Sequence, residues 1–381
     1  MNFAFINYPL ETFTPTQSGA LATIIWECCR VAVKRACEPY VITRDCPALS
    51  FKWRNLIKIP FPEATGGRPG TMLWRAERKL TGWRHLRHRT YARRVASAIR
   101  AAKLDGGPFV LLNDPEMAVF LRKQFPTATI AHWFENQLEC REPFKSAYRD
   151  AVDTTFGVSD YTSRWVENYY GLKQVDTLYN GVDGELFTPS EETIQAGDPP
   201  TINFVGRTGR EKGPDLLLKA ALELAGKSKT FSLQIVGSNH WDRLVMDEYQ
   251  QELNGYVQQL ERCGVKVSRP GHIGRADLPA VLRRAQINVI PARWDEPFGM
   301  TTIEGMACGL ATIASRTGGT PEVVGDAGIL FERENTSELA ERLQHLIGSP
   351  AERAVLQLRG RERALEFPWE RTWSELSTRV R

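Results

Sequence analysis

The sequence Asn203-Phe-Val-Gly-Arg-Thr-Gly-Arg-Glu-Lys-Gly-Pro-Asp215 runs from an apolar strand through a glycine-rich loop into the start of a helix. Glycine lets a loop backbone approach a ligand closely, and a helix start presents N–H groups with a partial positive charge. Arg207 and Lys212 add cations, so the stretch suits a diphosphate. A simple turn with solvated charges is the alternative for this segment alone. The Gly-x-x-x-x-Gly-Lys-Ser/Thr motif of a Walker loop is absent.

A second loop reads Asp295-Glu-Pro-Phe-Gly-Met-Thr-Thr-Ile-Glu304 and follows an apolar run that ends at Pro291. Glu304 lies about two helical turns beyond Glu296, inside the next predicted helix. Carboxylate oxygens each accept more than one hydrogen bond and therefore suit sugar hydroxyls. We expect Glu296 to hold a donor sugar and Glu304 a ribose. The alternative makes Glu296 a helix cap and Glu304 a surface residue.

A third glycine-bearing loop, Thr317-Gly-Gly-Thr-Pro-Glu322, follows the next apolar run. Three such loops, each between a strand and a helix, fit one nucleotide-sugar site better than three unrelated turns.

Short apolar runs alternate with helical periodicity along the whole chain, which predicts parallel sheets covered by helices. A polar, proline-containing break at 187–200 predicts a domain boundary. We therefore expect an α/β protein with two doubly wound, Rossmann-like domains facing a cleft. The expected strands are Asn2–Asn7, Pro108–Asn113, Ala128–His132, Thr154–Val158, Thr201–Val205, Ser232–Val236, Ile287–Pro291 and Ala311–Ala314, and the clearest helices are Asp215–Gly226, Asp277–Ala285 and Ser337–Ile347.

The composition is that of an ordinary globular protein: 381 residues, 42% hydrophobic and 25% charged, with a net charge of +4. Seven cysteines without a Cys-x-x-Cys pair argue against a zinc site or a disulfide framework. The start lacks a signal-peptide pattern, and no stretch is long and apolar enough for a membrane span. We expect a cytoplasmic location.

The chain resembles the retaining glycosyltransferases of the GT-B fold, family 4, over essentially its C-terminal half. The matching residues are Phe204-Val-Gly-Arg207 with Lys212-Gly213, the Glu296–Glu304 pair around Pro-Phe-Gly, Gly318-Gly319 with Pro321-Glu322, and Asn180-Gly-Val-Asp183 with Phe187.

The resemblance implies that Arg207 and Lys212 bind the donor diphosphate, without a metal or other cofactor. It implies that Glu296 contacts the donor sugar, with the backbone of Phe298, Gly299, Met300 and Thr301 beside it, and that Glu304 binds the ribose. It also implies domains at 1–187 and 188–367, with the terminal helices from 368 to 381 crossing back onto the first.

The N-terminal half departs from the family pattern. The usual Gly-Gly loop reads Thr16-Gln-Ser-Gly-Ala-Leu21, so only Gly19 remains for approach to the donor. His132 ends an apolar run where the family often has a histidine that contacts the sugar, and Trp133 replaces the usual acid, with Glu135 two positions on. We count His132 with Arg207, Lys212 and Glu296 as catalytic residues, against the alternative of a structural histidine.

The segment 68–103 contains eleven Lys and Arg against one acid, Glu77, with Trp74, Leu80, Trp83 and Leu86 interleaved. A basic amphipathic segment is typical of peripheral attachment to an anionic membrane, here the inner face. The alternatives are a solvated helix with its aromatic side chains packed inward, or a nucleic-acid surface, which lacks a recognition motif.

The resemblance therefore implies transfer of a sugar from a UDP- or GDP-linked donor, with retention, to a glycan, lipid-linked or small-molecule acceptor in cell-surface polysaccharide or glycoconjugate synthesis. The alternatives are a sugar-nucleotide epimerase or phosphorylase on the same fold, or a non-catalytic adaptor that binds a sugar nucleotide or a lipid. No nucleic-acid partner is expected.

Overall fold

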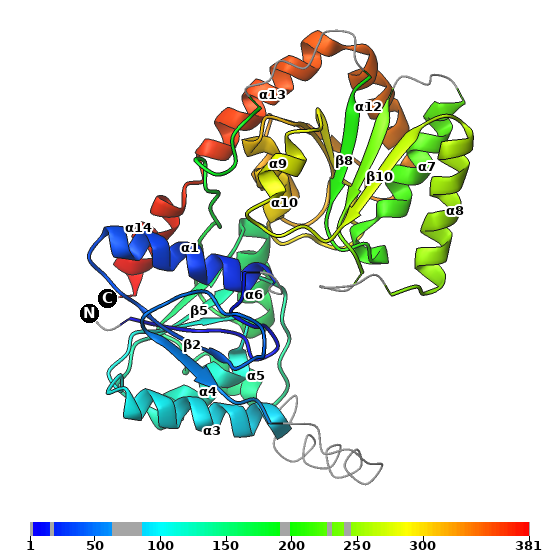
Figure 1. Ribbon diagram of the computed structural model, residues 1–381. Coiled ribbons are helices and arrows are strands. Elements are labelled where there is room, and N and C mark those ends of the chain that lie inside the picture. The colour runs from blue at the N-terminus through cyan, green and yellow to red at the C-terminus, as the bar shows by residue number, and fades with distance from the viewer. Residues whose placement is uncertain are drawn as a thin grey trace. The chain divides into compact units, whose positions relative to one another are not determined.

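A computed structural model of the protein describes residues 3–15, 19–62, 86–190, 199–226, 231–239 and 245–380. The chain forms two compact units, Met1–Gly181 with Trp369–Arg381, and Val182–Pro368 (Figure 1). Each unit has a parallel sheet with helices around it, which confirms the expected α/β class.

In the described part of the first unit, seven parallel strands form a sheet of order β3-β2-β1-β4-β5-β6-β7. The order reverses between β1 and β4, where Ala4 aligns with Phe109. Residues of β4 and β5 are buried without alternation, as expected for strands covered on both faces. The strands are β1 Ala4–Ile6, β2 Tyr40–Arg44, β3 Leu56–Ile59, β4 Phe109–Leu112, β5 Ile130–Phe134, β6 Thr154–Gly157 and β7 Asp176–Thr177.

The helices of this unit begin where the sequence supplies caps. Asp114 accepts a hydrogen bond from the Met117 N–H at 3.0 Å, with Pro115 at the first helical position of α4. Ser159 caps α6 in the same way, at 3.2 Å from the Thr162 nitrogen. The helices are α1 Ala20–Lys34, α3 Leu86–Ala101, α4 Pro115–Gln124, α5 Phe144–Tyr148, α6 Asp160–Tyr170 and α14 Trp369–Arg379.

The second unit has six parallel strands among its described residues, in the order β10-β9-β8-β11-β12-β13. Here the order reverses between β8 and β11, which pair at Ile202 and Ile287. The strands are β8 Thr201–Val205, β9 Ser232–Val236, β10 Lys266–Gly271, β11 Ile287–Ile290, β12 Ala311–Ser315 and β13 Ile329–Phe331. The helices are α7 Pro214–Ala225, α8 Glu248–Arg262, α9 Leu278–Leu282, α10 Met300–Ala307, α11 Thr320–Val324, α12 Thr336–Gly348 and α13 Pro350–Leu365.

The chain leaves the first unit at Gly181, whereas we placed the boundary at 187/188. Residues 182–187 pack in the second unit because α13 and its end bind them: the Val182 N–H donates to the Phe367 carbonyl at 2.8 Å, and Arg361 Nη1 donates to the Phe187 carbonyl at 2.5 Å. Helix α14 packs in the first unit beside α1 (Figure 1), with Trp373 at 5.3 Å, ring centre to ring centre, from Phe3.

Strand β5 runs from Ile130 to Phe134, so the expected strand Ala128–His132 ends two residues too early. Trp133 and Phe134 continue the strand because both are completely buried. All seven cysteines are free. Within the described ranges, no helix has both the length and the apolar character needed to cross a bilayer.

Candidate active site

In the second unit, the loops that follow β8 and β11 leave the sheet where the strand order reverses. Ligands of doubly wound sheets bind beside the carboxyl ends of strands at such a reversal. The loop 206–213 follows β8 and contains Lys212, and the loop 291–299 follows β11 and contains Glu296. The loop 316–319 follows β12 and lies next to them.

Lys212 and Glu296 form an ion pair across the first two loops. Lys212 Nζ lies 2.6 Å from Glu296 Oε2, and the two side chains are 21% and 10% exposed. Trp294 joins them, because its Nε1 donates to the same Glu296 oxygen at 2.9 Å and its ring centre lies 4.5 Å from Lys212 Nζ. A half-buried cation and a buried carboxylate therefore lie side by side at the predicted diphosphate and sugar positions.

Glycines let the three loops approach this closely. At Gly213, φ is +68° and a Cβ would lie 2.0 Å from the Pro291 carbonyl oxygen. At Gly318, φ is +52° and a Cβ would lie 2.3 Å from the Glu296 carbonyl oxygen. The Gly319 N–H donates to that oxygen at 2.8 Å. The glycines of the motifs thus fix the backbone around Glu296.

A buried ion pair ties the start of α7 to the β11 loop. Arg293 binds both oxygens of Asp215, each at 2.7 Å, and Tyr249 and Lys219 also donate to Asp215, at 2.5 and 3.0 Å. Burial alone would raise the pKa of Asp215, but these hydrogen bonds outweigh it and hold the pKa well below its usual range. This contact was not predicted from the sequence, because Arg293 lies 78 residues from Asp215 and outside the quoted motifs.

The start of α10 supplies the expected backbone donors. Gly299 precedes the helix with φ +89°, so the N–H groups of Met300 and Thr301 lie in a first turn without intrahelical acceptors. The Phe298 side chain is buried, with its ring centre 5.9 Å from that of Phe367. Only the backbone of Phe298 is available at this turn.

Glu304 is buried on α10 and forms an ion pair with Arg275, which follows β10. Burial raises the pKa of Glu304, and the adjacent Arg275 lowers it in part. The alternative of a surface position for Glu304 is wrong. Arg275 was missed, although Gly271-His-Ile-Gly-Arg275 is another glycine-bearing loop after a strand.

Arg207 lies on the same loop as Lys212, but its Nη2 is 3.3 Å from Glu211 Oε1 and its side chain is 49% exposed. The structure therefore brings Lys212 together with Glu296, and places Arg207 and Glu304 in ion pairs with other residues.

In the first unit, Gly19 precedes α1, and a Cβ there would lie 2.4 Å from Glu11 Oε1. The Glu11 carboxylate therefore lies at the start of α1, where the helix dipole favours a negative charge. This placement does not support the expected approach of a donor phosphate to Gly19. Ser18, which precedes Gly19 in this loop, lies outside the described residues.

His132 is completely buried, and both its ring nitrogens are bonded. Nε2 accepts from the Asp114 N–H at 3.0 Å, and Nδ1 lies 2.7 Å from the Tyr148 hydroxyl. Burial lowers the pKa of His132 to about 3, so the ring is neutral. The expected sugar contact is not supported, because His132 lies inside strand β5 and not at its end.

Glu135 is the acid that follows β5, and it was noted in the sequence without a role. It is buried, its N–H donates to Asn113 Oδ1 at 2.8 Å, and its Oε2 accepts from Asn180 Nδ2 at 2.8 Å. Burial raises the pKa of Glu135 to about 8; the bond from Asn180 lowers it and the charge of Glu11 raises it. Glu135 and Glu11 follow β5 and β1 and therefore belong to the carboxyl edge of this sheet.

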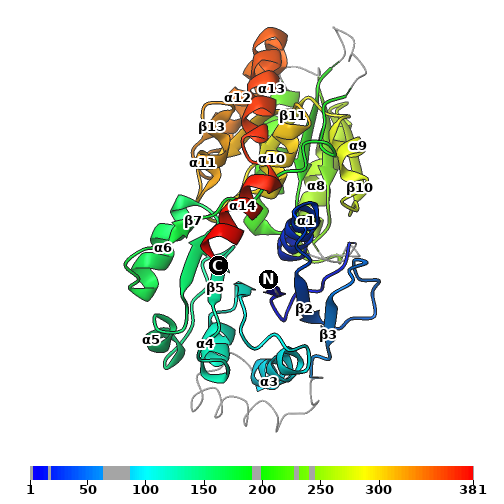
Figure 2. The ribbon, with the colours of Figure 1, turned by 90° about the vertical axis from the view of Figure 1, so that its left-hand side faces the viewer.

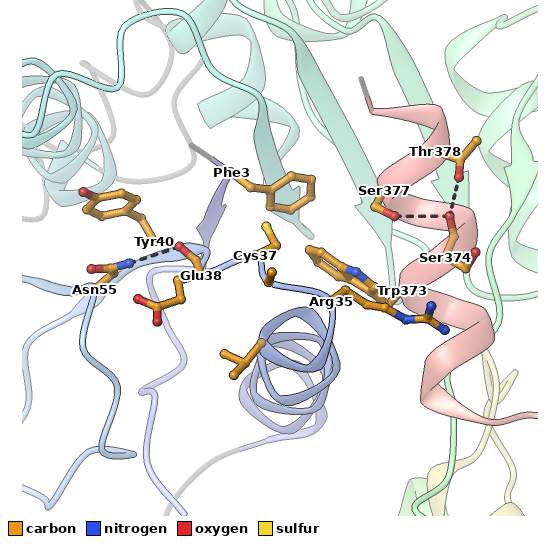
Figure 3. Close-up of a pocket in the computed structure, with 12 residues that line it drawn as sticks. Phe3, Arg35, Cys37, Glu38, Tyr40, Asn55, Trp373, Ser374, Ser377 and Thr378 are labelled. Carbon is orange, nitrogen blue, oxygen red and sulfur yellow. Dashed lines mark hydrogen bonds between the residues drawn. The ribbon is translucent and has the colours of Figure 1, made fainter. Parts of the chain in front are cut away.

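A cavity of about 970 Å³ opens at the amino ends of β1 and β2 beside α14 (Figure 3). Two of its polar side chains bind nearby backbone: Asn55 donates to the Glu38 carbonyl at 3.0 Å, and Thr378 donates to the Ser374 carbonyl at 2.7 Å. Because it lies at the edge opposite to the strand ends where ligands bind, we do not assign it to the reaction.

Solved structures with the same architecture cover nearly the whole chain. Sucrose-phosphate synthase from Thermosynechococcus elongatus matches 99% of this chain and 98% of its own, with 19% identity and a TM-score of 0.77. HepE from Anabaena in complex with UDP-glucose matches 98% of each chain, with 16% identity and a TM-score of 0.68. The protein therefore has the GT-B fold of glycosyltransferases.

The site loops lie within residues 189–363, which match the family model of the glycosyl transferases group 1. This segment, slightly less than half of the chain, resembles that family. Spore coat protein SA from Bacillus subtilis is 26% identical over 77% of this chain and 82% of its own length. D-inositol 3-phosphate glycosyltransferase from Thermobifida fusca is 30% identical over 58% of this chain, which spans about half, 53%, of that relative.

Proposed function

We propose that the protein is a retaining glycosyltransferase that transfers a sugar from a UDP- or GDP-linked donor to an acceptor hydroxyl. The observation that carries this proposal is the Lys212–Glu296 ion pair at the reversal of strand order. The complexes of the structurally similar HepE with UDP and UDP-glucose support a nucleotide-sugar donor.

Lys212 and Arg207 bind the donor diphosphate in this proposal. Before the donor arrives, each cation is paired with an acid of its own unit, Glu296 and Glu211. A phosphate oxygen replaces Glu296 at Lys212 Nζ, and the released carboxylate then accepts hydrogen bonds from the donor sugar. The first turns of α7 and α10 add backbone N–H groups. We assign to these cations the role that a metal ion plays in other transferases.

We assign Glu304 to the ribose, as a carboxylate held in place by Arg275. Because burial opposes its ionisation, the charge of Arg275 is what favours a carboxylate that can accept two ribose hydroxyls. Arg275 is then a positioning residue.

Transfer proceeds by attack of the acceptor hydroxyl on the same face of the sugar that the diphosphate leaves. The bond from the anomeric carbon to the phosphate oxygen breaks, the bond to the acceptor oxygen forms, and the acceptor proton passes to the leaving diphosphate. Lys212 and Arg207 stabilise the negative charge that grows on the diphosphate.

We assign acceptor binding to the carboxyl edge of the first unit's sheet, near Glu135. A glycan, a lipid-linked saccharide or a small molecule is the acceptor class we propose, in cell-surface polysaccharide or glycoconjugate synthesis at the cytoplasmic face of the membrane. One relative named above acts, by its name, on a phosphorylated small molecule, D-inositol 3-phosphate.

The test compares donor binding and turnover in the wild type, in Lys212→Ala and in the control Lys266→Ala, which removes an exposed lysine at the start of β10. A bound donor raises the melting temperature by mass action, so a screen of UDP, GDP and ADP sugars identifies it. We expect Lys212→Ala to lower kcat by about 100-fold to 1,000-fold, as loss of one preorganised charge does, and Lys266→Ala to have no effect.

Product anomers followed by NMR report retention or inversion directly. Near wild-type kcat for Lys212→Ala with saturating donor would refute the assigned role, and an epimer formed from the donor alone would favour the epimerase alternative.

A further inference from the structure

Helices α3, α4 and the start of α5 enclose a groove of about 510 Å³ on the first unit. Figure 2 shows α4 between α3 and α5. The wall that α3 contributes to the groove consists of Arg89, Arg93 and Arg100. These side chains share one helix face because they are spaced by four and seven positions. Lys123 of α4 faces the same groove.

The groove is cationic on its walls and apolar at its base. Of the residues that line it in the described part of the chain, four are cations and none is an acid. Arg100 is held by neutral groups: its Nη2 donates to Gln124 Oε1 at 2.9 Å, and its guanidinium lies 4.9 Å from the ring centre of Phe125. Arg93 and Lys123 are exposed, whereas Phe144 is buried and Phe120 is half-buried.

Among the side chains of α3 that the structure describes, 87–101, the large apolar ones face the core and not the solvent. Its apolar residues Tyr91, Val95 and Ile99 are completely buried in the core of the unit. In this part of the basic segment the described apolar side chains therefore pack inward, and attachment of 68–103 to a membrane stays a prediction. Trp74, Leu80 and Trp83 lie outside the described residues. What α3 presents outward is positive charge, since 86–101 contains five arginines and no acid.

We propose that this groove binds the phosphate headgroup of an anionic phospholipid and so attaches the protein to a membrane surface. Arg93, Arg100 and Lys123 hold the phosphate, and the half-buried Phe120 contacts the glycerol and the first methylenes. This inference is independent of the proposed transferase reaction.

The combination of charge and apolar base favours a lipid over a free polyanion. A soluble phosphate needs only the cations, and a single-stranded nucleic acid is bound on exposed rings where its bases stack, whereas Phe144 is buried and Phe120 is half-buried. The surrounding arginines of α3 add long-range attraction to a negatively charged surface, which salt weakens.

The test measures sedimentation of the full-length protein with phosphatidylcholine vesicles, with and without phosphatidylglycerol. The variant Arg93→Ala/Lys123→Ala removes two groove cations. The control Arg164→Ala/Lys173→Ala removes two exposed cations of the same unit outside the groove and changes the net charge equally. Unchanged circular dichroism and melting temperature verify folding.

We expect binding only to the phosphatidylglycerol vesicles. The groove variant should lower the partition coefficient about 30-fold, because each cation near an anionic surface contributes about a factor of five. Phe120→Ala should lower the partition coefficient without any change of charge. The control variant should lower it much less than the groove variant.

Three results would overturn the proposal. The first is no binding of wild type to anionic vesicles. The second is an equal loss of vesicle binding in both double variants, which would show that net charge alone causes the binding. The third is equally tight binding of soluble glycerol phosphate or of a polynucleotide to the groove, which would identify a free anion as the ligand.

Discussion

Lys212 Nζ and Glu296 Oε2 lie 2.6 Å apart although 84 residues separate them in the chain. The contact joins the β8 loop to the β11 loop, and Trp294 binds the same carboxylate oxygen. Lys212, neutralised by Glu296, separates from this carboxylate only when another anion binds Lys212 in its place. Under the proposed function, the pair therefore couples donor binding to the release of Glu296.

Replacement of Glu296 separates sugar contacts from diphosphate contacts. We expect Glu296→Ala to bind UDP or GDP as tightly as wild type or more tightly, because Lys212 loses its competing acid, while kcat falls by about 100-fold. Calorimetry with the nucleotide and steady-state kinetics measure the two effects. Glu223→Gln, at an exposed acid of α7, is the control. Weaker nucleotide binding in Glu296→Ala would contradict the exchange of partners at Lys212.

Gly213→Ala should destabilise the second unit strongly, because the new Cβ meets the Pro291 carbonyl in a backbone conformation that alanine rarely adopts. The expected loss in the free energy of unfolding is about 2 kcal/mol or more. Gly255→Ala in α8 is the matched control: nothing lies within 4 Å of its Cβ, and alanine should stabilise the helix by about 0.5–1 kcal/mol. Urea unfolding of both variants checks the contrast in sign.

The buried Glu135 predicts stability that falls as pH rises. Its pKa is about 8 in the folded protein against 4.5 for the ordinary group, so the folded state binds more protons in this window. The contribution is complete below pH 4.5, decreases toward pH 8 and is absent above it. Glu135→Gln resembles the protonated form, so its unfolding free energy relative to wild type should rise across that window. Asp105→Asn, at an exposed acid, should show no such trend. A constant difference between wild type and Glu135→Gln would show that Glu135 ionises normally.

His132 predicts the opposite pH dependence. Its pKa falls to about 3 from 6.5 on burial, so the unfolded state binds more protons. Its contribution is complete above pH 6.5 and is lost as pH falls toward 3. The ring should remain neutral, with the proton on Nδ1, when the imidazole ¹⁵N shifts are followed down to about pH 4. Titration near 6.5 would instead indicate an accessible ring and restore a sugar contact.

Local patterns in the sequence were enough for the fold and for the loops of the site. The strands Thr201–Val205 and Ser232–Val236 have the predicted bounds, because continuous apolar runs between helical segments specify buried parallel strands. The motifs around Lys212 and Glu296 were recognisable because glycine, cation and acid must occur at fixed positions within each short loop.

Burial and partner choice were decided only by the tertiary structure. Glu304 with Arg275, Asp215 with Arg293, and Lys212 with Glu296 each join segments far apart in the sequence, and their ion pairs form only when the strands assemble in a non-sequential order. The same holds for His132, whose enclosure depends on Asp114 and Tyr148 from neighbouring elements. The sequence of one segment determines which side chains a loop contains. The free energy of burying a charge or a ring, however, depends on partner groups from other segments, which only the folded structure brings together.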